Sequence, residues 1–497
     1  RGRPTQIIEA FGTAAARATT ITWHTTYNVP TNVTTPDLST DNVWNTSGRL
    51  ESKTETDTTS HTLPYPTNGQ TRTWVYTYTT GGLVATVDGP LPGAGDTVSY
   101  TYDADGYVAT YTDEFGHVPT VLATNDRGQP TEIEDASGLI TDIIYDDLGR
   151  VSSMVADPSG IAATTSFEYD GADNVTKVTQ PNGSFLEMAY DGMNRVVSVE
   201  NNYGDIAEYT YDDMGNVTRV EVSNGFPQLF FQWDRTFDEL GRLISLTGVS
   251  TETWTYGYDK VGNPTSTTDP NSKTAAFGYD GLNRLVSFTD ERSDVTNWAY
   301  GSRPEPTSTT DDRSVVTGYV RNGWGETIQE DSTDIGAVVY ERDGNGSIVE
   351  RTDARGVVTE FAYDDADRIV STTYPGETTS NVTYTYDSVA GGNFGVGRLT
   401  GATDAAGTVS YTYDILGRVV SEQRIIGAAT YTVGYTYDAA GKLSAITYPS
   451  GRVVTYDRDN AGDITAISQQ PSGGAQSWVG LWVGHTPFGP RSGIQFA

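Results

Sequence analysis

Aspartate is the residue type whose spacing in this 497-residue sequence comes closest to a chemical site, because carboxylates at short intervals can bind Ca²⁺. The segment DGNGS, which begins at Asp343, places a carboxylate, an amide and a hydroxyl at alternate positions, as an EF-hand loop does at its start. Position twelve of that frame is Ala354 rather than Glu, so the loop is incomplete. The adjacent carboxylates Asp146 and Asp147 would need a pocket to act as a glycosidase pair, and the sequence indicates a turn there. Capping of local turns is therefore the simpler role for the aspartates.

Other residue types that do chemistry are scattered along the chain. The four histidines have no metal-ligand spacing, and His117, which follows a turn glycine, is interpreted as a solvated surface residue. The segment GGNFGVG at Gly391–Gly397 is similar to a phosphate loop, but it interrupts a hairpin and precedes no helix, so we interpret it as a loop insertion. Nucleophile-elbow, P-loop and zincin motifs are absent from the sequence. The sequence therefore predicts no enzyme activity, no cofactor and no bound metal.

The composition excludes several classes of partner. Acidic residues outnumber basic ones by 65 to 31, which gives a formal net charge of −34 at pH 7. Such a surface repels nucleic acid and anionic lipid, so we expect neither as a partner. The absence of cysteine excludes disulfides and thiolate zinc sites. No apolar run approaches the roughly 18 residues of a membrane-spanning helix. The 31 tyrosines, with abundant Thr, Val and Gly, favour short strands and tight turns.

One motif, Tyr-Asp-x-x-Gly, returns about every 21 residues, as it does between Tyr190 and Tyr211. The position four residues after the Tyr is Gly, Asn or Asp, which tolerate positive φ, and the motif Asp suits the first position of a turn. Each copy is therefore predicted to form a tight turn, with positive φ at Asn194 and Asn283. The turn residues that we single out are Tyr145, Asp146, Gly149, Tyr190, Asp191, Asn194, Tyr211, Asp212, Gly215, Phe237, Asp238, Gly241, Tyr258, Asp259, Gly262, Tyr279, Asp280, Asn283, Tyr413, Asp414 and Gly417.

Degenerate copies and a second turn complete the period. The degenerate copies begin at Trp44, Tyr78, Tyr300, Arg321, Arg342 and Arg458. The second turn lies about half a period after the first, as in DEFG at 113–116 and DARG at 353–356. Two turns per period leave two strands of about five or six residues, so each repeat is predicted to be one β-hairpin. Apolar residues two and five places past the turn predict a β-bulge, and alternate tyrosines are expected to stack across neighbouring strands.

Hairpins of this length are marginal alone and must pair edge to edge. Strands twist in one direction, and here they mix apolar with hydroxyl residues on both faces. We therefore expect an all-β fold, a spiralling single-layer sheet of repeated hairpins that forms a β-shell. Phe237, Tyr258 and Tyr279 are expected to lie in a row at spacings of about 10 Å. The expected division is degenerate N-terminal repeats at 1–98, a regular shell at 99–470, and the start of a further repeat or a C-terminal strand pair at 471–497, with the pattern cut at both ends.

Copies such as YDDLGR at 145–150 and YDILGR at 413–418 resemble the Rhs/YD-repeat family. This family includes bacterial Rhs polymorphic toxins, toxin-complex C components, wall-associated proteins and teneurins. The resemblance covers about 99–468 and implies a hollow β-shell, which in the toxins encloses a C-terminal effector. The DPxGL-type motif at which the toxin shells cut themselves has no counterpart here, so self-cleavage and toxicity are not carried over.

The expected function is a non-enzymatic structural shell segment of a secreted or surface-delivered bacterial protein. Its expected partner is an enclosed effector polypeptide encoded outside this chain, held in a lumen lined by Tyr, Thr, Val and charged side chains. The alternative is a cell-surface adhesion or carbohydrate-binding protein, in which surface glycans would stack on aromatic residues such as those of the Trp-rich segment 476–490. A glycan-active β-solenoid enzyme is a third interpretation.

Overall fold

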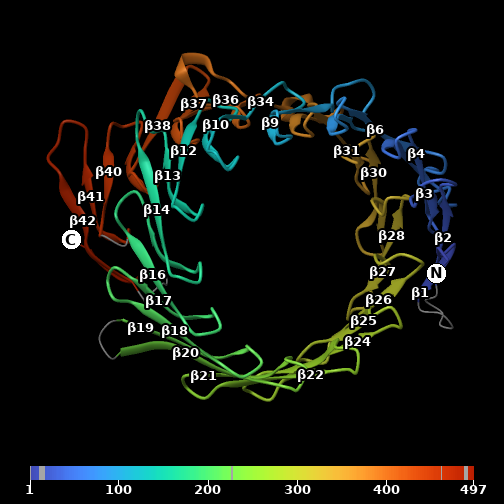
Figure 1. Cartoon of the computed structure of the whole chain (residues 1–497), viewed down its shortest axis with the longest axis horizontal. Coiled ribbons are helices and arrows are strands. Elements are labelled where there is room, and N and C mark those ends of the chain that lie inside the picture. Colours follow the sequence, from blue (N-terminus) through green and yellow to red (C-terminus); the bar gives the residue numbers. More distant parts are fainter. Residues whose placement is uncertain (1, 10–16, 225–227, 460–461, 486–490, 497) are drawn as a thin grey trace. The chain divides into compact units, whose positions relative to one another are not determined.

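The computed structural model is built of β-strands (Figure 1). The residues that it describes are 2–9, 17–224, 228–459, 462–485 and 491–496. Among them the helices are two single 3₁₀ turns, η1 (Thr378–Ser380) and η2 (Ala390–Gly392). No helix in this described part of the chain is long and apolar enough to cross a membrane. The all-β class predicted from the motif is confirmed.

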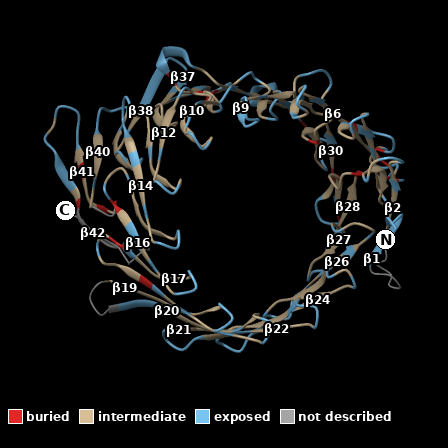
Figure 2. Cartoon of the chain, viewed as in Figure 1, coloured by how far each residue is buried: buried red, intermediate tan, exposed pale blue. Residues whose placement is uncertain are grey.

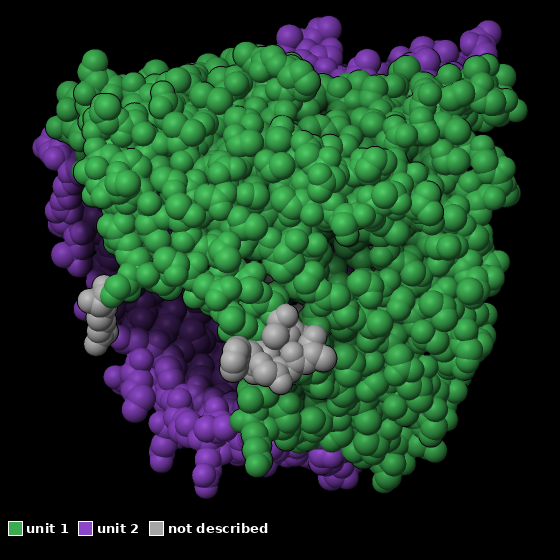
Figure 3. All heavy atoms as spheres, turned by 90° about the vertical axis from the view of Figure 1, so that its right-hand side faces the viewer, with its two compact units in different colours: residues 1–118, 256–383 green, residues 119–255, 384–497 purple. Residues whose placement is uncertain are grey.

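The chain divides into two compact units, and each unit is made of two separate stretches (Figure 3). Unit 1 contains residues 1–118 and 256–383, and unit 2 contains residues 119–255 and 384–497. The first stretch of unit 1 has β1 (Gln6–Glu9), β2 (Arg17–Trp23), β3 (Pro30–Thr34), β4 (Leu38–Trp44), β5 (Leu50–Asp57), β6 (Thr71–Tyr78), β7 (Val84–Asp88), β8 (Val98–Tyr102) and β9 (Val108–Thr112). Its second stretch has β23 (Pro264–Thr268), β24 (Thr274–Tyr279), β25 (Leu285–Thr289), β26 (Val295–Tyr300), β27 (Pro306–Thr310), β28 (Val316–Arg321), β29 (Thr327–Ser332), β30 (Gly336–Arg342), β31 (Ile348–Thr352), β32 (Val358–Tyr363) and β33 (Ile369–Thr373), between β22 (Thr253–Tyr258) and β34 (Val382–Tyr386).

Unit 2 has the same construction. Its first stretch has β10 (Thr120–Thr124), β11 (Pro130–Glu134), β12 (Ile140–Tyr145), β13 (Val151–Ala156), β14 (Ala163–Tyr169), β15 (Val175–Thr179), β16 (Phe185–Tyr190), β17 (Val196–Asn201), β18 (Ile206–Tyr211), β19 (Val217–Asn224), β20 (Gln228–Phe237) and β21 (Leu243–Gly248). Its second stretch has β35 (Leu399–Asp404), β36 (Gly407–Tyr413), β37 (Val419–Ile426), β38 (Ala429–Tyr437), β39 (Leu443–Thr447), β40 (Val453–Arg458), β41 (Ile464–Gln470), β42 (Ser477–His485) and β43 (Arg491–Phe496).

Consecutive strands pair antiparallel, so each repeat is one hairpin joined to the next. The pairing runs without interruption through β1–β9, β10–β22, β23–β34 and β35–β43. Between β12 and β13 the register passes from Ile144 opposite Ser153 to Tyr145 opposite Val151, which leaves Ser152 as an extra residue. The same shift recurs at other motif tyrosines, so the predicted bulge is confirmed.

Little of the sheet is covered by a second layer (Figure 2). Among the described residues the buried hydrophobic side chains are Ala207, Ile328, Val338 and Ile464. A two-layer sandwich of this size would enclose a continuous apolar core, and these four side chains do not form one. The single-layer prediction is therefore confirmed.

The turns have the backbone geometry that the motif predicts. Asn194 has φ 62° and Asn283 has φ 60°, and Gly241 at the equivalent position has φ 74°. Positive φ at these two asparagines is thus confirmed. The row of Phe237, Tyr258 and Tyr279 runs from one unit into the other, and its spacing stays a prediction.

Candidate functional site

The residues singled out from the sequence occupy equivalent places. Each motif Tyr or Phe is the last residue of a strand, as Tyr145 is in β12 and Phe237 is in β20. The Asp follows as the first residue of the turn, and its backbone N–H bonds to the carbonyl four residues on, as from Asp146 to Arg150. The residues that close the turns at positive φ are Gly149, Asn194, Gly215, Gly241, Gly262, Asn283 and Gly417.

The motif aspartates cap their own turns. In the first regular copy, Asp146 Oδ1 accepts hydrogen bonds from the backbone N–H groups of Leu148 and Arg150, at 3.0 and 2.9 Å. This arrangement satisfies two donors that the tight turn would otherwise leave unpaired. It recurs at Asp191, Asp212, Asp238, Asp259 and Asp280.

The arginine that follows many turns joins one repeat to the next. Arg150 donates from Nε to Asp146 Oδ2 at 2.7 Å, and its guanidinium carbon lies 4.4 Å from the centre of the Tyr169 ring. Its Nη1 also donates to the carbonyl of Asp170, at 3.1 Å. A guanidinium can make these contacts together because its donors lie in a plane that also stacks on aromatic faces. Arg195, Arg284 and Arg418 lie over the tyrosines of the next repeats in the same way.

The tyrosine hydroxyl makes the return contact. Tyr169 donates to the carbonyl of Val151, the first residue of the preceding repeat's second strand, at 2.7 Å. The same bond is made by Tyr102, Tyr145, Tyr190, Tyr211, Tyr300, Tyr363, Tyr413 and Tyr437. Adjacent repeats are therefore joined by an Arg reaching forward and a Tyr reaching back.

The degenerate copies that lack the tyrosine keep a donor at its position. Arg321 Nη1 donates to the carbonyl of Pro306 at 2.6 Å, and Arg342 Nη2 donates to that of Thr327 at 3.0 Å. Arg458 bonds Leu443 in the same way, and Trp44 Nε1 bonds Pro30. Tyr, Arg and Trp can thus all supply the hydrogen-bond donor at this position.

These contacts shift the pKa values of the motif residues. The hydrogen bond from the Arg195 guanidinium, with that from its backbone N–H, lowers the pKa of Asp191. Burial raises the pKa of Tyr211, whose ring lies beneath the same arginine. Both shifts favour the protonation states that the contacts between repeats need at neutral pH, which are an ionised Asp and a neutral Tyr.

A second contact system joins the two stretches of unit 1. We call the sheet edge formed by the motif turns the YD edge, and the edge formed by the intervening turns the opposite edge. The YD edge of residues 256–383 lies against the opposite edge of residues 1–118. Successive turns meet successive loops in the same order: Arg303 meets Asp37, Gly323 meets Asp57, Gly344 meets Pro90, and Arg368 meets Phe115.

Asp57 is the centre of this seam and is 1% exposed. Its Oδ1 accepts from the Thr59 backbone N–H at 2.7 Å and from the Thr59 hydroxyl at 2.5 Å, and its Oδ2 accepts from the Gly323 N–H at 2.5 Å. Burial alone would raise the pKa of Asp57, but these hydrogen bonds hold it below its usual value. A Cβ on Gly323 would lie 2.7 Å from the Asp37 carbonyl oxygen, so the turn must carry glycine there.

The next residue, Trp324, is covered by the same seam. The Arg72 guanidinium lies 4.1 Å from the centre of its ring and pairs with Glu326 at 2.8 Å. The indole Nε1 donates to Glu55 Oε2 at 3.0 Å. Beside these residues is a pocket of about 540 Å³, and the Tyr65 hydroxyl that lines it donates to the Tyr340 carbonyl.

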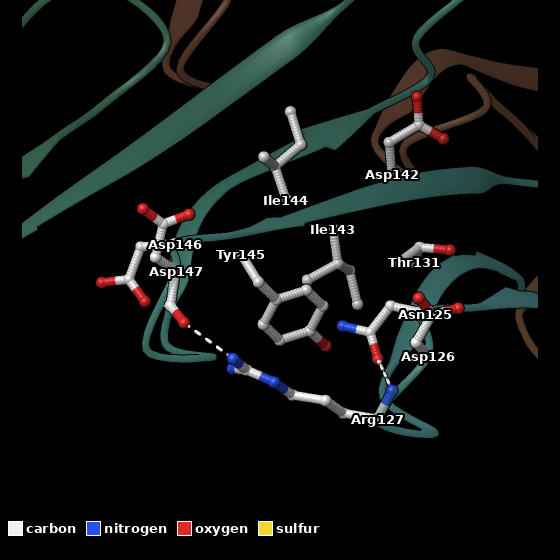
Figure 4. Close-up of a pocket in the computed structure, with 10 residues that line it drawn as sticks. All are labelled: Asn125, Asp126, Arg127, Thr131, Asp142, Ile143, Ile144, Tyr145, Asp146 and Asp147. Carbon is white, nitrogen blue, oxygen red and sulfur yellow. Dashed lines mark hydrogen bonds between the residues drawn. The ribbon is translucent and has the colours of Figure 1, made fainter.

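Unit 2 has an open pocket of about 630 Å³ between two neighbouring turns (Figure 4). In Figure 4, Arg127 extends below the Tyr145 ring toward the backbone of Asp147, whose carbonyl it bonds at 2.7 Å. Asp126 and Asp142 also line this space. Within the described ranges no group of three or more His, Cys, Asp or Glu residues could hold a metal ion.

The other sequence candidates have local roles. Asp343 Oδ1 accepts from the N–H groups of Asn345 and Ser347, so Asp343 caps its turn as expected. Gly391–Gly397 is a loop between β34 and β35. His117 was expected to be solvated, but its Nδ1 pairs with Asp113 Oδ2 at 2.8 Å and its side chain is about one-fifth exposed (20%). Of the Trp-rich segment, residues 486–490 lie outside the described residues.

Sequence reasoning missed two sets of residues. The sequence contained a signal for the role of the motif arginine, because an Arg directly after the turn is followed by the Tyr of the next repeat, as Arg150 is by Tyr169 and Arg195 is by Tyr211. The seam residues Asp57, Arg72 and Tyr65 lie around an irregular loop in the degenerate N-terminal region, where the repeat gives no pattern to follow.

Two family models match the sequence. The teneurin YD-shell model matches residues 205–389 and 325–479, which together cover more than half of the chain. The RHS repeat model matches residues 145–184 and 169–206. These matches confirm the resemblance inferred from the motif. No curated protein sequence matches the chain at a significant level.

Several solved structures have the same fold. The TcdB2-TccC3-Cdc42 structure is 12% identical, with a TM-score of 0.75 over 99% of this chain and 36% of that chain. TcdB2-TccC3 without its hypervariable C-terminal region is 11% identical, with the same TM-score and coverage. A Photorhabdus luminescens Tc holotoxin pore is 12% identical, with a TM-score of 0.65 over 97% of this chain and 36% of that chain. The chain thus spans 36% of the length of these solved chains, and the likeness confirms the shell fold.

Proposed function

This chain belongs to the teneurin YD-shell family, and from that premise we propose that it is a non-enzymatic shell segment that encloses an effector polypeptide lying outside these 497 residues. A structural role is what the family and the fold support. The observation that carries the proposal is the single-layer sheet, whose repeats are joined through turns and edges rather than around a core. Such a sheet is suited to forming a wall.

The expected setting is a secreted or surface-delivered bacterial protein. The similar Tc holotoxin structure is from Photorhabdus luminescens, and one similar structure joins TcdB2-TccC3 to Cdc42. The presence of Cdc42 with TcdB2-TccC3 in a structure of this fold supports a shell that carries a further polypeptide. A lining of Tyr, Thr, Val and charged side chains would hold such a cargo without binding it through a large apolar surface.

Protection of a joined reporter from protease tests this proposal. A small reporter protein joined after Ala497 is digested with trypsin and compared with the same reporter added as a separate chain. The joined reporter should be cleaved far more slowly, and Gly323→Ala, which disturbs the seam in unit 1, should remove part of the protection. Equal cleavage rates for the joined and separate reporters would contradict the enclosing role.

Binding of surface glycans is the second candidate. The observation that favours it is the exposure of aromatic rings on β38 and β42, where Tyr431 and Trp478 are each 47% exposed. Aromatic faces of this kind can stack on sugar rings. A glycan array tests the idea with Trp478→Ala as the matched variant, and binding that is unchanged by this substitution would remove the support.

A further inference from the structure

The YD edge of unit 2 exposes a periodic row of apolar side chains at the tips of its turns. Leu148, Met193, Met214 and Leu240 are 70%, 69%, 64% and 71% exposed. Each is the third residue after its motif Tyr or Phe. Successive motif turns are separated by two strands, so Met193, Met214 and Leu240 follow one another at about 10 Å, and Leu148 lies two turns before Met193 because the turn between them has Ala172 at this position. Several apolar tips in one row form a surface of the kind that marks an interaction site.

Acidic residues accompany this row. Asp147, Asp213 and Glu239 directly precede Leu148, Met214 and Leu240, and all three are exposed. We call the four apolar residues and these three acids the apolar row. Its surface therefore combines apolar tips with negative charge, which fits a cover that is cationic and has aliphatic stems.

The seam in unit 1 shows how such a tip is covered. Trp324 is the equivalent third residue of its motif copy, and it is only partly exposed because Arg72, at the start of β6, lies over its ring at 4.1 Å. Arg72 also pairs with the carboxylate of Glu326 on the same turn. Phe115 and Arg368 repeat this contact at 4.5 Å, with the edges exchanged. The contact that recurs is a guanidinium over an apolar turn tip.

Unit 1 also carries a matching row of arginines on the opposite edge of its second stretch. Arg292, Arg313 and Arg355 each occupy the tip of a turn and are exposed, and the side chains of Arg313 and Arg355 are 68% and 80% exposed. They lie 21 and 42 residues apart, so they follow the same period as the apolar row. We call these three residues the arginine row.

We propose that the chain associates head to tail with a second copy of itself, the apolar row of one copy receiving the arginine row of the other. The contact continues the seam seen in unit 1, in which a YD edge lies on an opposite edge. Guanidinium groups lie over Leu and Met tips and pair with Asp147, Asp213 and Glu239. An interface of this kind is heterologous, because the two surfaces differ, and it leaves one free row on each copy.

Sedimentation velocity of the full chain tests this interface. The measurement is made at about 0.15 M salt, where a Debye length of about 8 Å limits the repulsion between two chains of net charge −34. The wild-type chain should associate reversibly as its concentration rises to about 100 μM. The apolar-row variant replaces Leu148, Met193, Met214 and Leu240 with Ser. The arginine-row variant replaces Arg292, Arg313 and Arg355 with Gln.

Each variant alone should be monomeric, since each lacks one of the two surfaces. An equimolar mixture of the two should form a one-to-one pair, because each variant still contributes one intact row. A control variant replaces Val249 and Val389, which are exposed outside both rows, with Ser and should associate as the wild type does. Circular dichroism and melting curves establish that each variant is folded, as expected for exposed positions.

Three results would overturn the proposal. A wild-type chain that remains monomeric at about 100 μM has no such interface, and its apolar row would belong to a different partner. Association that persists in the apolar-row variant would place the contact elsewhere. A mixture of the two variants that remains monomeric would rule out the pairing of unlike rows.

Discussion

Gly323 is the residue at which the seam of unit 1 can be tested by a single methyl group. A Cβ at this position would lie 2.7 Å from the Asp37 carbonyl oxygen and 2.8 Å from Asp57 Cα. Both atoms belong to the backbone, so the turn itself must move away from Asp57. Gly323→Ala should therefore separate the Gly323 N–H from the buried Asp57 carboxylate, which it now bonds at 2.5 Å.

The magnitude follows from these two effects. Overpacking of a tight contact costs about 1–3 kcal/mol. Removal of one donor from a buried carboxylate costs about another 1–3 kcal/mol. We expect the free energy of seam opening to fall by about 3 kcal/mol, which corresponds to about a hundredfold faster exchange of the amides that open with it. Hydrogen exchange of residues 57–72 and 322–326 measures this directly.

Gly192→Ala is the matched control. Gly192 has the same place in its motif, two residues after the Tyr, and a Cβ there would meet nothing within 4 Å. Its substitution should leave exchange in its own turn unchanged or slightly slower, since Ala restricts the unfolded chain. If Gly323→Ala and Gly192→Ala had the same small effect, the seam would not hold the two stretches of unit 1 together and our reasoning would be wrong.

Four further outcomes follow from the repeat contacts. Hydrogen bonds donated by Arg195 lower the pKa of Asp191, so this stabilisation should be present above pH 4 and lost as the pH falls through the folded pKa. An acid titration that leaves the melting temperature unchanged would contradict it. Burial raises the pKa of Tyr211, so its contribution should be complete below pH 10 and lost as the pH rises through the folded value, which alkaline unfolding followed by tyrosinate absorbance measures. Tyr211→Phe should cost about 1 kcal/mol by removing the 2.6 Å bond to the Val196 carbonyl, with Tyr209→Phe on the same strand as the control in urea unfolding. Gly241→Val should cost about 1–2 kcal/mol because Gly241 has φ 74°, and an unchanged melting curve would show that the turn accepts a β-branched residue.

The regular part of this fold could be predicted because the turn residues, the strand lengths and the apolar spacing all indicate the same hairpin. The positive φ at Asn194 follows from a turn that closes at one position, and the bulge opposite Tyr145 follows from the apolar spacing after the turn. Each copy of the repeat is separate evidence for the same local structure, so one interpretation explains all copies. The predicted stacking of tyrosines across strands occurs between Tyr100 and Tyr111, whose ring centres are 5.4 Å apart. The ring contact that recurs along the repeats is instead an arginine over a tyrosine, as at Arg150 and Tyr169.

The seam could not be predicted in the same way. Asp57 and Gly323 are 266 residues apart, and which loop meets which turn depends on how far the sheet curves over many strands. Small differences in twist accumulate along such a sheet, so the pairing cannot be calculated from a 21-residue pattern. Asp57 is the single buried carboxylate among the residues that the structure describes, and a residue that occurs once leaves no signal in a repeat pattern.

The degenerate copies show what the repeat selects at its first position. Tyr169, Trp44 and Arg321 differ in charge and shape, but each places a donor on a carbonyl of the preceding hairpin. The accepting carbonyl belongs to the first residue of a strand, so the donor joins the start of that strand to the next hairpin. Phe237 has no donor, so its repeat lacks this hydrogen bond. The hairpin of β20 and β21 nevertheless keeps the register shift of the other copies, with Phe237 opposite Leu243, so the geometry of the turn does not depend on this hydrogen bond.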